Sequence, residues 1–137
     1  MERADLPQDV KLERPSSGVA VVSFTGDHDL ATRDATRRLL ANLVEENNLV
    51  LADFSEASFV DTSIMVVIRE SGRAARERGS LFRLQLSTAP IVEMLFKASG
   101  VVDDVECVTT RQEGLRAAAT PAGDVGAEGS GEETRRG

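Results

Sequence analysis

Residues 49–63, with the sequence LVLADFSEASFVDTS, contain the features that decide the fold. The first part, residues 49–54, is an almost unbroken apolar run, which is typical of a strand buried on both faces of a sheet. A polar turn and a short apolar pair follow, and then the polar triplet at 61–63 precedes a second apolar run, residues 64–68, with helical spacing. We therefore expect a strand, a turn and a helix, with the triplet in the first turn of the helix.

Strand and helix patterns alternate along the rest of the chain, and glycines follow two of the expected helices at Gly79 and Gly100. The expected strands are a short edge strand at 10–12, then 19–24, 49–54, 81–86 and a short strand within 101–108; the expected helices are 30–46, 62–78, 89–99 and 109–119. Such alternation is typical of a mostly parallel sheet with helices packed against it. The predicted fold class is therefore α/β, a single domain with a mixed, mostly parallel sheet of four to five strands and about four helices.

The chain divides into one folded unit and a tail. Residues 1–119 are expected to form the domain, with an ordered core at 8–119. Residues 120–137 are rich in Gly, Ala and acids and contain almost no apolar side chains, which predicts a disordered tail.

Composition excludes several functional classes. The net charge is −7 at pH 7, with 16 Lys and Arg against 23 Asp and Glu, which argues against binding to nucleic acid. No apolar run approaches the ~20 residues that a membrane span needs, and the N-terminus lacks the pattern of a signal peptide. Cys107 is the single cysteine, so no internal disulfide can form. We expect a cytoplasmic protein without contacts to membranes.

Motifs for catalysis and cofactor binding are missing from the sequence. It contains no GxxxxGK[ST] loop, no GxGxxG after a strand, no GxSxG elbow and no HExxH. Gly26-Asp27-His28-Asp29 combines one histidine with two acids, but their adjacent positions do not suit a zinc site. We interpret it as a strand-to-helix turn in which Asp29 caps the helix and His28 faces solvent or a partner. No enzyme activity, cofactor or metal is expected.

Asp53, at the end of a predicted strand, offers one alternative. Acids that follow strands of an α/β fold can bind Mg²⁺ and accept phosphate, as in response-regulator receivers, and Asp27 and Asp29 follow the preceding strand. That family also needs a lysine after a later strand, whereas Lys97 lies inside a predicted helix. The alternative predicts an acyl phosphate at Asp53.

The triplet Asp61-Thr62-Ser63 has two interpretations. All three residue types are favoured at a helix N-cap, where a side chain satisfies free backbone N–H groups. The same position also suits a phosphoacceptor, because the helix dipole favours negative charge there. The two roles are compatible.

Taken together, the ordered motifs resemble those of STAS domains, specifically the bacterial anti-sigma factor antagonists. The resemblance extends from about Val10 to Ala119. It is based on a strand that leads to Gly-acid-x-Asp, here GDHD at 26–29; an apolar strand ending in Asp53; the segment FVDTSI at 59–64, where the family has Phe-x-Asp-Ser-[Ser/Thr]-Gly; and a helix ending in Ser-Gly at 99–100.

The resemblance implies a partner switch. The unmodified protein would bind an anti-sigma factor with Ser/Thr kinase activity, phosphorylation of Thr62 (or, as second choice, Ser63) would release it, and a Ser/Thr phosphatase would restore it. Contacts with the partner are expected at Asp27, His28, Asp29, Asp61, Thr62, Ser63 and Ile64, and homodimerisation is left open. Ile64 replaces the family glycine and adds a branched side chain at the expected contact surface, which motivates the alternative of a STAS interaction or scaffold module that is not phosphorylated.

Overall fold

In the computed structural model, the strands form one sheet in which their spatial order follows their order in sequence. The structure describes Leu6, residues 9–86 and residues 89–116. The strands are β1 (Val10–Ser16), β2 (Val19–His28), β3 (Leu49–Val60), β4 (Leu81–Gln85) and β5 (Glu106–Val108). β1 pairs with β2 in antiparallel orientation, and each later pair is parallel. The predicted mixed, mostly parallel sheet with β1 at its edge is confirmed.

The helices follow the predicted order. They are the 3-10 turn η2 (Leu30–Thr32), α1 (Arg33–Glu46), α2 (Thr62–Arg78), α3 (Pro90–Ser99), the short α4 (Val101–Asp104) and α5 (Arg111–Gly114). The bounds of α2 agree with the prediction at both ends. The final helix, expected at 109–119, is shorter than predicted, since α5 begins at Arg111 and ends at Gly114; residues 117–119 and the predicted tail lie outside the described residues.

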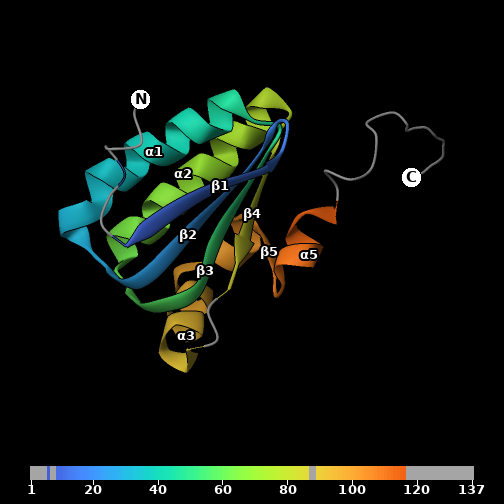
Figure 1. Cartoon of the computed structure of the whole chain (residues 1–137). Helices are drawn as coiled ribbons and strands as arrows, with labels where there is room; N and C mark the ends of the chain where they lie inside the picture. Colours follow the sequence, from blue (N-terminus) through green and yellow to red (C-terminus); the bar gives the residue numbers. More distant parts are fainter. Residues whose placement is uncertain (1–5, 7–8, 87–88, 117–137) are drawn as a thin grey trace.

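The helices lie on both sides of the sheet. Crossovers between parallel strands are right-handed. Because β2, β3 and β4 follow one another in the same direction across the sheet, the crossover helices α1 and α2 must lie on the same face. Figure 1 shows these two helices side by side there, with α5 on the other side of the sheet. Within the described residues, no helix is both long and apolar enough to cross a membrane.

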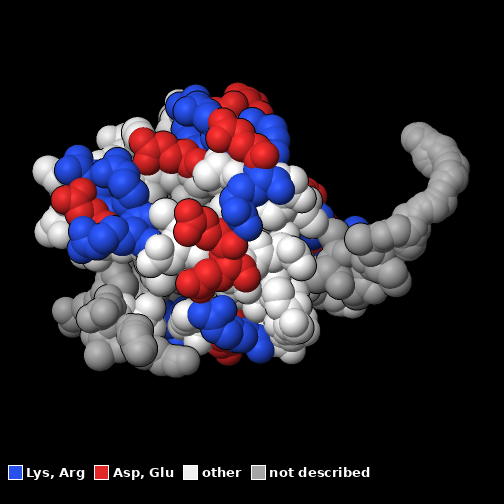
Figure 2. All heavy atoms as spheres, turned by 90° about the horizontal axis from the view of Figure 1, so that it is seen from above, with Lys and Arg blue, Asp and Glu red and all other residues white. Residues whose placement is uncertain are grey.

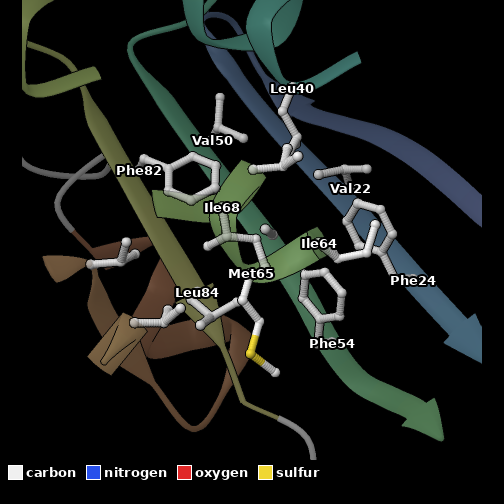
Figure 3. Close-up of a cluster of buried hydrophobic side chains, with 14 of the residues drawn as sticks. Val22, Phe24, Leu40, Val50, Phe54, Ile64, Met65, Ile68, Phe82 and Leu84 are labelled. Atoms are coloured by element: carbon white, nitrogen blue, oxygen red, sulfur yellow. The ribbon is translucent and has the colours of Figure 1, made fainter. Parts of the chain in front are cut away.

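Side-chain alternation along the strands builds a core on each face. On the face covered by α1, α2 and α3, Phe24 of β2 and Phe54 of β3 are fully buried and stack with ring centroids 4.3 Å apart. Phe96 of α3 packs edge-on against Phe54 at 5.6 Å. On the other face, Val21 and Leu51 form a smaller cluster. The main core therefore lies between the sheet and the α1–α3 layer (Figure 3).

β2 and β3 are longer than the sequence predicts. The turns expected at 26–28 and after residue 54 are instead paired strand, with Thr25, Gly26, Asp27 and His28 opposite residues 56–60 of β3. Each strand supplies hydrogen bonds to the other, so the polar residues satisfy their backbone groups without a turn. Two register shifts, between Ser23 and Thr25 and between Gly26 and Asp27, accommodate the extension.

Charges of both signs are mixed on the surface. Figure 2 shows basic and acidic side chains beside one another on the face seen from above. Ion pairs on α1 and α2 include Arg37 with Glu70 at 3.1 Å and Arg69 with Asp104 of α4 at 2.6 Å. The basic residues on this face are thus interrupted by acidic ones and form no continuous basic surface of the kind that nucleic acid binding requires.

Candidate functional site

The extended ends of β2 and β3 meet at the N-terminus of α2. The backbone N–H of Asp61 donates to the carbonyl of His28 across a distance of 2.8 Å, which joins the two strand ends. Asp61 is extended (φ −73°, ψ 156°), and its carboxylate accepts a hydrogen bond from the backbone N–H of Ser63 at 2.8 Å. Asp61 is therefore the N-cap of α2, as predicted.

The charge of Asp61 is favoured at this position. Its pKa is lowered from the ordinary value of 3.8, first by the Ser63 side chain and then by the Ser63 backbone N–H. The hydrogen bond that the geometry shows is the one from the Ser63 backbone N–H at 2.8 Å, and it favours the ionised carboxylate. A fixed negative charge at the start of a 17-residue helix complements the helix dipole.

Thr62 and Ser63 differ in accessibility. Thr62 is exposed, whereas Ser63 is partly buried and its Oγ is enclosed. Helical spacing explains the difference, because Thr62 lies on the same face as the exposed Val66, while Ser63 is aligned with the buried Val67 and Ser71. This spacing was present in the sequence and could have separated the two hydroxyls.

Ile64 does not reach the surface, contrary to the expectation from sequence. Its side chain is fully buried and points toward Phe24 and Phe54 (Figure 3). It belongs to the apolar stripe that continues with Ile68 one turn later, so the branched side chain fills the core instead of covering the contact surface.

The GDHD segment is only partly as predicted. Asp27 and Asp29 are exposed, and Asp29 caps η2 by accepting from the N–H of Ala31 at 3.0 Å, as expected. The prediction that His28 faces solvent is wrong, since its side chain is 1% exposed. Because β2 continues through this residue, the ring turns inward, packs edge-on against Phe24 at 5.2 Å, and places Nε2 2.9 Å from the carbonyl of Thr25.

Three exposed apolar side chains, which the sequence analysis did not identify, come from the elements that meet here. Leu30 of η2, Phe59 of β3 and Val66 of α2 are 61%, 41% and 48% exposed. We call them the apolar rim. Leu30 follows the strand end bonded to Asp61, Phe59 pairs in register with Asp27, and Val66 is one turn after Thr62. Exposed apolar side chains next to polar ones offer a partner both apolar area to bury and groups for hydrogen bonding.

The receiver-like arrangement is not formed. Asp53 lies within β3 and does not end it, and its Oδ1 accepts from the backbone N–H of Ser55 at 2.8 Å. Asp27 lies four residues along β2 from Ser23, the partner of Asp53, which is about 13 Å at the rise of an extended strand. The two carboxylates therefore do not converge. Among the described residues, no group of three or more His, Cys, Asp or Glu is arranged to hold a metal ion.

Comparison with known proteins identifies one family. The model of the STAS domain matches residues 13–114. No curated protein matches the chain significantly.

Solved structures share the fold at low identity. An anti-sigma factor antagonist from Mycobacterium paratuberculosis is 18% identical with a TM-score of 0.70, covering 80% of this chain and 92% of that chain. The anti-sigma factor antagonist SpoIIAA in its unphosphorylated form is 19% identical with a TM-score of 0.68, covering 80% and 96%. The STAS domain of a SulP transporter from Vibrio cholerae is 18% identical with a TM-score of 0.59, covering 85% and 92%.

Proposed function

The chain belongs to the STAS family, and on that premise we propose that it is an anti-sigma factor antagonist that docks through the N-terminus of α2. Its partner would be an anti-sigma factor with Ser/Thr kinase activity, and a Ser/Thr phosphatase would reverse the modification. This partner switch would act in the cytoplasm and regulate transcription indirectly. It needs no catalytic group from this chain.

The observation that carries the proposal is the exposure of Thr62 beside the apolar rim. A partner that covers Leu30 and Val66 gains apolar burial and would also cover the neutral hydroxyl of Thr62. The exposed Asp27 and Asp29 lie at the border of this surface and would form polar contacts there. His28, Ser63 and Ile64 would act from within, by holding the backbone that presents Thr62.

Phosphate at Thr62 would affect docking more than folding. It adds roughly −1.5 to −2 charges next to the Asp61 carboxylate. In the free protein the group would remain in water, and the helix N-terminus would offset part of the repulsion, by about 0.3–1 kcal/mol. In the complex an unmatched charge would be buried, which costs on the order of 2–5 kcal/mol. That difference weakens affinity by roughly 30-fold to several thousand-fold.

A second candidate is a STAS interaction or scaffold module that is not phosphorylated. The replacement of the family glycine by Ile64 favours it, because the buried Ile64 side chain anchors the first turn of α2 in the core. In this version the apolar rim still docks a partner, but no modification of Thr62 releases it.

Mapping the modification tests the first function against the second. The protein is incubated with its kinase anti-sigma factor and ATP, and the product is analysed by mass spectrometry. We expect one phosphate on Thr62, none in Thr62→Val, and unchanged modification in Ser63→Ala. A complex that survives ATP with both hydroxyls unmodified would instead establish the non-switching module.

A further inference from the structure

α3 has two apolar sides, although only one of them faces the core. Val92 and Phe96 are fully buried, and Phe96 packs edge-on against Phe54. Ile91 and Met94, in contrast, are 48% and 56% exposed. α3 lies at one end of the molecule (Figure 1) and differs there from α1 and α2, whose exposed sides consist largely of polar and charged residues.

The exposed apolar residues of α3 form a continuous stripe. Ile91, Met94, Leu95 and Ala98 follow the i, i+3, i+4, i+7 spacing that places side chains on one side of a helix. Three of them are exposed, and Leu95, at the border with the core, is partly buried. We call these four residues the α3 stripe. A single exposed apolar side chain is ordinary, but a stripe along a helix is a surface that a second helix can cover.

The charge of α3 favours a second copy of this chain as the partner. Glu93 and Lys97 are the charged residues of the helix, and they form an ion pair with 3.4 Å between the carboxylate oxygen and Nζ. The helix therefore has no net charge, whereas the whole chain has a net charge of −7. A strongly basic or acidic partner would find no excess of opposite charge on α3, and two copies of an acidic protein repel each other least where their contact surfaces are neutral.

The α3 stripe is complementary to itself when two helices run in opposite directions. In a two-fold symmetric contact each residue faces a different residue of the other copy, and the same contact occurs twice. With the axis between Met94 and Leu95, these two residues face each other across the centre. At the ends, the large Ile91 then faces the small Ala98 of the second copy, which lets the two helices approach closely.

The same register pairs the charges. Glu93 and Lys97 are on one flank of the α3 stripe, each directly before a stripe residue, and the two-fold axis brings this flank against the same flank of the second copy. Glu93 is then within one position of Lys97 of the second copy, about 1.5 Å along the helix axis. An acid therefore faces a base at both ends of the contact.

We propose that the chain forms a homodimer through the α3 stripe, with the two α3 helices packed antiparallel about a two-fold axis. This assigns a surface to the homodimer that the sequence left open. Met94 suits a central position, because its unbranched side chain adapts to the surface that it contacts. One helix pair buries less than the roughly 1,200 Å² of a standard interface, so we expect a weak dimer, with a Kd on the order of 0.1 mM.

Sedimentation equilibrium of the full chain at concentrations up to about 1 mM tests the dimer. We expect the average mass to rise with concentration toward that of two chains. Met94→Glu would bury a charge at the centre of the contact and should weaken dimerisation by roughly 30-fold or more. Val66→Glu is the matched control, since it adds the same charge at an apolar residue of α2 that is also about half exposed, and it should leave dimerisation unchanged.

Charge reversal tests the antiparallel arrangement. Glu93→Lys and Lys97→Glu each place like charges opposite each other at both ends of the contact, so each variant alone should dimerise several-fold more weakly. An equimolar mixture of the two variants should associate again, because every facing pair in the mixed dimer contains one acid and one base. The ion pair within each helix stays broken in the mixture, so its loss cannot produce the recovery.

Three results would overturn the proposal. They are a monomer at every concentration, an equal loss of association in Met94→Glu and Val66→Glu, and a mixture of the two charge variants that associates no better than its components. None of these results would affect the role proposed for Thr62, because the measurements contain no anti-sigma factor and no ATP.

Discussion

Glutamate substitutions at Thr62 and Ser63, made one at a time, separate docking from folding. Thr62→Glu places a carboxylate at an exposed position in the first turn of α2. Exposed substitutions change stability by about 0.5 kcal/mol or less, and a helix N-terminus attracts an anion by about 0.3–1 kcal/mol. For a domain of this size, 1 kcal/mol corresponds to roughly 4–8 °C in Tm, so Tm should move by only a few degrees.

The adjacent substitution should have a different effect. Ser63→Glu must place a longer, charged side chain where Oγ is enclosed by protein atoms. Either the carboxylate loses water or the first turn of α2 distorts, and a desolvated polar group costs about 1–3 kcal/mol or more. Tm should therefore fall by roughly 4–24 °C.

Partner binding, unlike Tm, should respond strongly to the substitution at Thr62. Thr62→Glu should weaken binding to the anti-sigma partner by roughly 30-fold to several thousand-fold, because the new charge is buried in the interface. Ser17→Glu is the matched control, since Ser17 is exposed in the turn between β1 and β2 at the other end of the sheet and the charge change is identical.

The measurements are calorimetric titration with the partner and differential scanning calorimetry of each variant alone. The reasoning is refuted if Thr62→Glu binds as tightly as the unmodified protein, or if it unfolds as readily as Ser63→Glu. The first result would remove Thr62 from the interface, and the second would mean that the side chain is not free in solution.

Three further predictions concern the fold. Phe54→Ala removes a fully buried ring stacked on Phe24 and should lower the free energy of unfolding by about 3–5 kcal/mol in urea titrations, whereas a loss below 1 kcal/mol would contradict the packing described. The folded pKa of Asp61 is lowered from 3.8, so the stability that its charge contributes is complete above pH 3.8 and is lost as pH falls through the folded pKa. Urea midpoints should therefore drop at acid pH. The drop should be smaller in Asp61→Asn, which still caps the helix. Burial and the nearby Glu106 raise the pKa of Cys107 to about 11, so a thiol reagent at pH 8 should react slowly with the folded protein and rapidly in urea, and equal rates would show that the thiol is accessible.

Local sequence patterns were sufficient to predict the elements whose ends are set by their own neighbouring residues. The span of α2 was predictable because Asp61 can cap it, its apolar residues recur at helical spacing, and Gly79 can adopt the left-handed backbone (φ 78°) that ends it. The cap at Asp29 and the order of strands and helices followed from the same kind of signal.

The ends of β2 and β3 were not predictable in this way. The segments GDHD and SEAS have turn-forming composition, but in the structure residues 25–28 of β2 pair with residues 56–60 of β3, and the pairing satisfies their backbone groups. A strand that depends on a partner more than 20 residues away leaves no local pattern. The inward position of His28 follows from this pairing, so it was missed for the same reason.

From its sequence alone, this chain determines an alternating α/β fold and the helix start at Asp61, because propensity, spacing and capping act within a few neighbouring residues. The tertiary structure decided which groups are accessible. Packing of α2 on the sheet leaves Thr62 in solvent and encloses the Ser63 hydroxyl, and pairing of distant strands turns His28 inward and places Asp53 in a cleft on the opposite face. The spacing within α2 already distinguishes Thr62 from Ser63, but the burial of His28 and the position of Asp53 depend on strands that pair across the sheet, and no single segment contains that information.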